Sequence, residues 1–303
     1  MNLVYAFLNN NFSKIESNKK DFSYASMPDY YNKTFDYNMQ HFDSGYMICQ
    51  EEEAKTGLFT NYITTESLMN TVEYKFIHKL LEDRWARYKI EFFLYHAFIR
   101  LIFVCIAVKI HNLKNVVHIE ADNIIYMDAR DRFNAVYGPG EFGYGLVSAL
   151  DASPGVIFFK DADAADRFLE QIRKLLQRGE SEIIKATGIP FSYITDMNFL
   201  YLMFMYNKHY RMLPCLPTGE CSQNFDKFKI LFDPAGYGQF LGGTNNGNSA
   251  GYINPQQFVG NFMQQKLVGV QYRDKKPYVS FNELEIPLYN LHMHNKKAIE
   301  SFI

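Results

Sequence analysis

The first half of the chain alternates short apolar runs with a long stretch of helical periodicity. Runs typical of buried strands lie at residues 3–8 (LVYAFL), 45–50 (GYMICQ) and 115–120 (NVVHIE). The polar residues 9–34 after the first run are expected to form loops, whereas residues 64–112 have a mostly helical pattern that opens with Thr/Ser–Glu capping residues. Strands that alternate with helices predict an α/β fold.

The second half begins regularly and then becomes rich in glycine and proline. We expect a strand at 155–159 (GVIFF), a helix at 161–179 with an acidic start and a Gly stop, and an apolar helix at 195–210 with Thr195 as its N-cap. The tail from residue 211 contains one more predicted strand, KLVGVQYR. Because no internal repeat or charged linker interrupts the pattern, we predict a single domain over the whole chain.

Composition supports a large folded core. Apolar residues make up 48% of the 303, and aromatic residues make up 17%, which suits core packing and also a sugar-binding cleft. The most apolar stretch, residues 92–110, contains His96, Arg100 and Lys109. Charges at such positions argue against a membrane span, so we predict a helix packed inside the protein and no transmembrane segment.

Charge and cysteine content narrow the range of partners and compartments. The net charge is −2 and no run of Lys/Arg is longer than two, which argues against nucleic acid as the main partner. The four cysteines show no CxxC spacing and indicate a reducing compartment, although Cys215 and Cys221 could close a loop disulfide. The N-terminus has no signal-peptide pattern, so we expect a cytoplasmic protein, free or peripheral at a membrane.

Two acids, Glu120 and Asp122, interrupt the third apolar run. On an extended backbone, residues i and i+2 face the same way, and adjacent carboxylates repel unless a cation or proton lies between them. The carboxyl end of a strand in an open α/β sheet is where ligands bind, and Mg²⁺ commonly takes one or two carboxylates plus phosphates. The alternative is structural: Glu120 pairs with a buried Arg or His, and Asp122 caps a turn with Asn123.

A second candidate group lies near the end of the chain, in the segment NLHMHNKK. His292 and His294 would face one way on an extended backbone, with Lys296 and Lys297 following. Together with the acids, such residues could hold a metal diphosphate, with carboxylates for the cation and lysine for the phosphate charge. The alternative is a solvated polar tail.

In order along the chain, these segments resemble nucleotide-sugar glycosyltransferases of the GT-A fold, in particular a bacterial and large-DNA-virus group. VVHIEADNIIYMD is similar to the acid-x-acid metal motif of that group, with Glu120 in place of its first Asp. FLYHAFIRLIFV, YITDMNFLYLM, LFDPAGYGQFLGG and NLHMHNKK resemble further segments of the group, with Asn295 where Ser is common.

The resemblance implies a GT-A-like, Rossmann-related mixed sheet flanked by helices. Residues 1–130 would form the nucleotide-binding half, and residues 131–303 the acceptor-side half with a C-terminal metal and phosphate segment. It also implies a hexosyl- or pentosyltransferase that uses Mn²⁺ or Mg²⁺ and a UDP- or GDP-linked sugar. The acceptor would be a hydroxyl of a glycan or glycoprotein, in the host cytoplasm if the source is viral.

The resemblance also assigns roles to individual residues. Asp122 and Glu120 would bind the metal, and His294 is a candidate third ligand, with His292 and Lys296 near the phosphates. Arg100 would reach the donor sugar or phosphate, or else it is a core arginine paired with an acid such as Glu120.

Two aspartates are candidates for the catalytic base that an inverting transferase needs; the sequence leaves open whether the enzyme inverts or retains. Asp196 begins an apolar helix, where the helix start would lower its pKa; the alternative is an ordinary N-terminal helix acid. Asp233 precedes a glycine-rich stretch that would allow close approach of a ligand.

Two rival functions stay open. Glu120, Asp122, His292 and His294 would suit a hydrolytic metal centre, such as a phosphoesterase or sugar-nucleotide hydrolase. A non-catalytic, aromatic-rich glycan-binding protein would make the two acids structural. The P-loop, zincin and serine-hydrolase motifs do not occur in the sequence.

Overall fold

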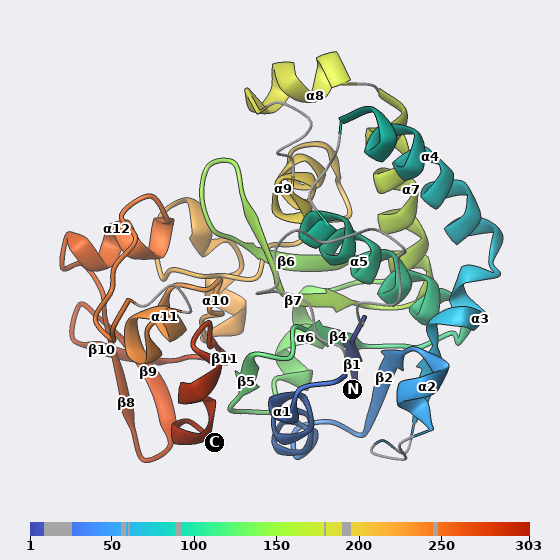
Figure 1. The fold of residues 1–303 in the computed structure, drawn as a ribbon. Helices are drawn as coiled ribbons and strands as arrows, with labels where there is room; N and C mark the ends of the chain where they lie inside the picture. The colour runs from blue at the N-terminus through green and yellow to red at the C-terminus, as the bar shows by residue number, and fades with distance from the viewer. Residues whose placement is uncertain are drawn as a thin grey trace.

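The computed structural model describes residues 1–8, 26–55, 59, 61–88, 92–178, 180–189, 195–244 and 248–303. Its centre is a six-stranded sheet of order β3-β2-β1-β4-β7-β6 (Figure 1). The strands are β1 (Asn2–Ala6), β2 (Ser44–Cys49), β3 (Tyr62–Thr64), β4 (Val116–Ile119), β6 (Phe142–Leu146) and β7 (Ala152–Phe159). The first four strands of that order are parallel, and β7 runs antiparallel to β4 and β6. The sheet is therefore mixed.

Helices cover both faces of this sheet. The helices in the described part of the chain are α1 (Asp29–Met39), α2 (Glu51–Ala54), α3 (Thr65–Met69), α4 (Val72–Tyr88), α5 (Phe92–Ile110), α6 (Arg130–Val136), α7 (Ala162–Arg178), α8 (Glu180–Thr187), α9 (Asp196–Tyr206), α10 (Phe225–Phe228), α11 (Tyr237–Gly242) and α12 (Phe258–Gln264), with 3-10 helices at Glu220–Ser222 and Lys296–Ser301. In Figure 1, α4, α5, α7 and α9 lie on one side of the sheet, and α1 and α6 lie on the other. The predicted mixed α/β class, a sheet flanked by helices, is confirmed.

Alternation along the strands produces two separate hydrophobic clusters. Val4 of β1 and Ile157 of β7 belong to the cluster with α5, α7 and α9, whereas Tyr5 and Phe158, their chain neighbours, belong to the cluster with α1 and α6. Because both faces are covered, the central strands are apolar at nearly every position, which is why they were recognisable as continuous runs.

Most of the predicted elements are present. The predicted interior helix at 92–110 is α5, and no helix in the described part of the chain is long and apolar enough to cross a membrane. The loop prediction for residues 9–34 is wrong at its end, where α1 begins at Asp29; residues 9–25, and the Gly179 stop predicted for α7, lie outside the described residues. All four cysteines are buried and free, so the alternative of a loop disulfide is wrong.

The C-terminal tail contains more strand than its glycines and prolines suggest. The predicted strand KLVGVQYR becomes β8 (Gly269–Arg273), which pairs with β9 (Lys276–Phe281), and β9 pairs with β10 (Leu284–Pro287). These three strands form a separate antiparallel sheet with α12 beside it (Figure 1). The chain then returns toward the central sheet.

That return forms the small two-stranded sheet that matters for the site. β11 (Asn290–His292) pairs antiparallel with β5 (Asn123–Ile125), and His292 lies opposite Asn123. Since β5 follows β4 after a short turn, the pairing brings the end of the chain to the carboxyl end of β4. Asn38 of α1 secures β5 by donating to the Asn123 carbonyl at 2.8 Å and accepting from the Ile125 N–H at 2.7 Å.

The order of the central strands identifies a ligand-binding edge. The chain runs from β1 to β2 and β3 on one side and then crosses to β4 on the other side of β1. In open α/β sheets, ligands bind outside the carboxyl ends of strands where the order reverses in this way. The residues that follow β4 therefore lie where a ligand is expected.

Candidate functional site

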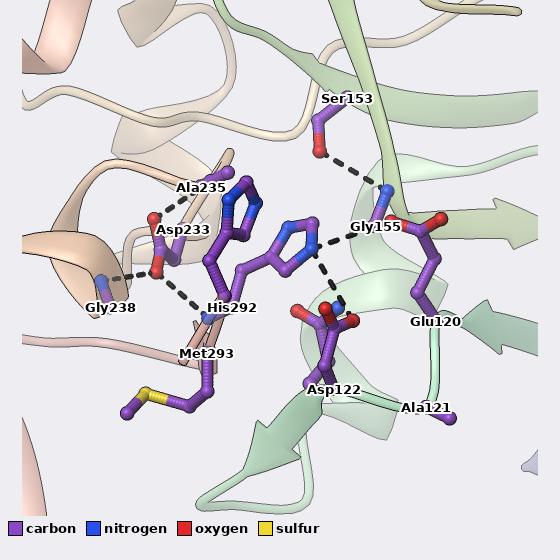
Figure 2. A network of polar contacts seen from close by, with 12 residues as sticks. Glu120, Ala121, Asp122, Ser153, Gly155, Asp233, Ala235, Gly238, His292 and Met293 are labelled. Carbon is purple, nitrogen blue, oxygen red and sulfur yellow. Dashed lines mark hydrogen bonds and ion pairs between the residues drawn. The ribbon is translucent and has the colours of Figure 1, made fainter. Parts of the chain in front are cut away.

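Three side chains of metal-binding type converge beyond the end of β4. One ligand atom from each of Glu120, Asp122 and His292 lies within 4.8 Å of the other two. The His292 Nε2 atom is 3.4 Å from the Glu120 Oε2 atom and 3.4 Å from the Asp122 Oδ1 atom (Figure 2). Residues separated by about 170 positions in the sequence thus share one site.

A turn brings the two acids together. The prediction that Glu120 and Asp122 are neighbours is confirmed, but its reasoning is wrong, because β4 ends at Ile119 and these residues form a turn instead of extended backbone. The Asn123 N–H donates to the Glu120 carbonyl at 2.9 Å and closes the turn. The Thr34 hydroxyl of α1 donates to the Ala121 carbonyl at 2.7 Å and fixes it from outside.

Each of the two carboxylates uses one oxygen in an ion pair with a positively charged side chain. Arg100 of α5 pairs with Glu120 Oε1, and Lys296 pairs with Asp122 Oδ2. The pairing of Glu120 with a core arginine, one of the two alternatives for Arg100, is therefore present. The remaining oxygens, Glu120 Oε2 and Asp122 Oδ1, are the ones that face His292. The site is a compact arrangement of two acids, one histidine and two bordering cations.

The electrostatics of the cluster favour charged acids. Burial raises the pKa of Asp122, but Lys296 and His292 outweigh it and hold this pKa well below its ordinary value. Burial likewise raises the pKa of Glu120, and Arg100 and His292 bring it below the ordinary value. For His292, burial lowers the pKa and the two carboxylates raise it more. The pair of anions therefore favours a positive charge between them, which is why the two carboxylates raise the pKa of His292.

A divalent cation could supply that positive charge. Ligands about 2.1 Å from one octahedral ion lie roughly 3–4 Å from each other, close to the separations in this cluster. The imidazole of His292 is held over Gly155 of β7, where an added Cβ would lie 2.7 Å from Nδ1, and that buried Nδ1 has no partner among the described residues. Two carboxylate oxygens and one imidazole nitrogen are ligands that Mn²⁺ accepts, so the residues fit such an ion.

The structure brings His292, and not His294, into the three-atom cluster. The two imidazoles are in edge contact with centroids 4.8 Å apart, and Gln239 of α11 lies 3.1 Å from His294 through its amide nitrogen. Burial lowers the pKa of His294 to about 4, so the ring is neutral at pH 7. His294 is thus a neighbour of the site, and its predicted role as a ligand stays a prediction.

Asp196 lies at the first turn of α9, buried and on the Arg100 side of the site. Its pKa is raised to about 6, because burial and the nearby Glu120 charge together outweigh the opposing effect of Arg100. The expectation that the helix start would lower this pKa is wrong, because removal from water outweighs the hydrogen bond from the Met197 N–H, 3.0 Å from Oδ1. Thr195 caps α9 as predicted, through a capping box with Asn198.

Asp196 should make stability depend on pH. Its pKa is 3.8 ordinarily and about 6 when folded, so the folded state holds the extra proton and stability falls as pH rises through that window. We expect a loss on the order of 2–3 kcal/mol between pH 4 and 7 in urea unfolding of the metal-free protein. Asp196→Asn should remove this contribution to the pH dependence of the free energy of unfolding. Asp163→Asn, at an exposed acid in the first turn of α7, should leave it unchanged; equal slopes in all three proteins would contradict the prediction.

Asp233 is almost completely buried, and its carboxylate is surrounded by backbone amides. Oδ1 accepts from the N–H groups of Ala235, Gly236 and Tyr237, and Oδ2 accepts from those of Gly238 and His292. Figure 2 shows the contacts with Ala235, Gly238 and His292. The sequence singled out Asp233 by its glycine-rich surroundings, but it gave no sign of the contact with His292.

Comparisons with known proteins give structural matches only. No family model and no curated protein matches the chain. Similar solved structures include the apo form of mouse xyloside xylosyltransferase 1, with 10% identity and a TM-score of 0.44 over 71% of this chain and 86% of that one. The galactosyltransferase LgtC with donor and acceptor sugar analogues has 9% identity and a TM-score of 0.40 over 71% and 73%. The glycosyltransferase GlyE of Streptococcus pneumoniae TIGR4 has 13% identity and a TM-score of 0.37 over 70% and 45%. Likeness at this level assigns no function.

Proposed function

We propose that the protein is a metal-dependent glycosyltransferase, which moves a sugar from a nucleoside diphosphate donor to a hydroxyl of a glycan acceptor. One observation carries the proposal: Glu120, Asp122 and His292 converge at the ligand-binding edge of the sheet, bordered by Arg100 and Lys296. Acids and imidazole suit a divalent cation, and the cations suit the phosphates attached to it.

Glu120, Asp122 and His292 would hold Mn²⁺ or Mg²⁺, with His294 as a further candidate. When bound, the ion would stabilise the negative charge that develops on the leaving nucleoside diphosphate. The ion pairs that Arg100 and Lys296 now make would weaken, because the carboxylate charge would be shared with the ion. Both side chains would then be free to approach phosphate oxygens, and Lys296 stays close to the Tyr30 ring, 5.9 Å from its centroid.

Asp196 is our candidate for the base that takes the acceptor proton. A buried carboxylate with a pKa of about 6 is a better base near neutral pH than an ordinary aspartate, and it still ionises there. Asp233 suits this role poorly, since amide donors already occupy both of its oxygens. We further propose that residues 1–130 bind the nucleotide and that residues 131–303 form the acceptor side.

Binding measurements separate this proposal from its rivals. We expect calorimetry to show that UDP or GDP binds in the presence of Mn²⁺ and that a chelator abolishes binding. Transfer of labelled sugar to a glycan array then identifies the acceptor. Release of phosphate or free sugar without any acceptor would favour the hydrolase, and glycan binding that is unaffected by a chelator would favour the binding protein. If no nucleotide binds with any divalent metal, the transferase proposal is wrong.

A further inference from the structure

The backbone N–H of His292 has an unusual partner. The next residue, Met293, donates its N–H to the Asp122 carbonyl on the β5 side at 2.8 Å. Because successive residues of a strand direct their amides to opposite sides, the His292 N–H faces away from β5. On that side the His292 N–H donates to Asp233 Oδ2 at 2.8 Å. A side-chain carboxylate thus accepts the hydrogen bond that a backbone carbonyl of a neighbouring strand would accept in a regular sheet.

The segment before Asp233 runs beside β11 as a partial third strand. Leu231 forms a parallel bridge with Leu288, and the Asp233 N–H donates to the side-chain oxygen of Asn290 at 3.0 Å. The Asn290 amide nitrogen in turn lies 3.2 Å from the Asp233 carbonyl oxygen. Beyond Asp233 the chain turns away into Pro234 and α11. The Asp233 carboxylate therefore makes the last hydrogen bond between this segment and β11, and it makes it to His292, the residue whose imidazole belongs to the proposed metal site.

The same carboxylate fixes the start of α11 against His292. Four of its five amide donors belong to residues 235–238, so the loop folds around the aspartate. At Gly238 an added Cβ would collide with the His292 carbonyl and lie 3.0 Å from Asp233 Oδ2. On the far side, the His292 imidazole rests on Gly155. The position of His292 is thus determined between β7 and the Asp233 loop.

We infer that Asp233 is a positioning residue for the metal site: through the His292 backbone it holds the imidazole against Glu120 and Asp122, and so sets the affinity for a divalent cation. The inference rests on the proposed metal site. It gives Asp233 a different role from the catalytic base expected from the sequence, because Oδ1 accepts three amides and Oδ2 accepts two.

The test compares Asp233→Asn with wild type in Mn²⁺ titrations of the nucleotide-free protein, followed by calorimetry and electron paramagnetic resonance. Asparagine keeps the size but turns an amide donor toward some of the five N–H groups. We expect affinity to fall by about 10-fold or more, the range seen for residues that support metal ligands. The Co²⁺ absorption spectrum, which reports imidazole ligation, should change as well. Hydrogen exchange of the metal-free protein should speed up over residues 290–294.

Asp161→Asn is the matched control. Asp161 also accepts backbone amides, from Gly140 at 3.0 Å and Ala164 at 2.9 Å, but at the start of α7. The Asp161→Asn variant should have a Mn²⁺ affinity within about twofold of wild type, since the hydrogen bonds that Asp161 accepts lie away from the metal site. Gly238→Ala covers the case in which Asp233→Asn fails to fold: it keeps the carboxylate but pushes on the His292 carbonyl, and it should weaken Mn²⁺ binding too.

The outcomes separate the two proposals. If wild type binds no Mn²⁺, either alone or together with UDP or GDP, the proposed metal-dependent function is wrong. If wild type binds Mn²⁺, while Asp233→Asn folds and retains both the affinity and the Co²⁺ spectrum, the role of Asp233 is overturned and the metal site stands. If only Gly238→Ala can be measured, an unchanged Mn²⁺ affinity in that variant also overturns the proposed role of Asp233.

Discussion

Asp122→Asn is expected to abolish metal-dependent nucleotide binding. The carboxylate is ionised at all neutral pH values because Lys296 and His292 hold its pKa far down, so it supplies a full negative charge to the cluster. Asparagine keeps the shape and removes that charge. Loss of a residue that only supports a metal ligand costs roughly 10–100-fold, so loss of a ligand should cost about 100-fold or more in Mn²⁺-dependent UDP or GDP affinity. Sugar transfer should become undetectable.

The control for this variant is Asp128→Asn, six residues along the chain. Asp128 is half exposed and pairs with Arg130, so its loss should leave nucleotide affinity unchanged. Circular dichroism and thermal unfolding should show that both variants fold, and isothermal calorimetry with and without Mn²⁺ measures the binding. Retention of metal-dependent nucleotide binding by Asp122→Asn would refute the proposed site.

Arg100→Met is expected to be the most destabilising single change near the site. Arg100 and Glu120 form a pair whose side chains are only 19% and 17% exposed. Removing the arginine leaves Glu120 buried without its main counter-charge, which typically costs about 3–5 kcal/mol. Methionine fills a similar volume, so the cost reflects lost charge pairing more than a cavity. Urea unfolding of the metal-free protein measures it.

Two further variants isolate the cause. Arg100→Met/Glu120→Gln removes both charges and should recover much of the loss, because a pair replaced on both sides leaves no isolated charge. Lys109→Met lies on the same helix and breaks pairs with Glu73 and Asp166, but at the surface, where the loss should be about 1 kcal/mol or less. A cost for Arg100→Met as small as that for Lys109→Met would mean that the buried pair contributes little to stability.

The central elements followed from local pattern. The buried strands β1 and β4 and the helix α5 were predictable because both sides of each are covered, so apolar residues are nearly continuous in the sequence. The β9–β10 pairing was missed. β8, β9 and β10 are partly exposed and mix Lys, Glu and Pro with apolar residues, so the strand signal there is weak.

The site was predictable as a set of residue types but not as a geometry. The acids stood out because charge interrupts an apolar run, and the HMH segment stood out because two histidines flank a methionine. The sequence could not choose between His292 and His294, since period-two alternation places both on one face. The register of β11 against β5 places His292 in the cluster with Glu120 and Asp122, whereas the ring of His294 lies beside it, with its centroid 4.8 Å from that of His292.

Burial decided what the sequence could not. Asp196 and Asp233 are both aspartates at or just before the start of a helix, and nothing local distinguishes them. Burial raises the pKa of both carboxyls, that of Asp196 to about 6. At Asp233, five backbone amides from two distant segments oppose this rise. Residue types and the positions of the central strands and helices followed from the sequence alone; strand order, pairing and the pKa shifts depend on contacts between distant segments, which only the tertiary structure supplies.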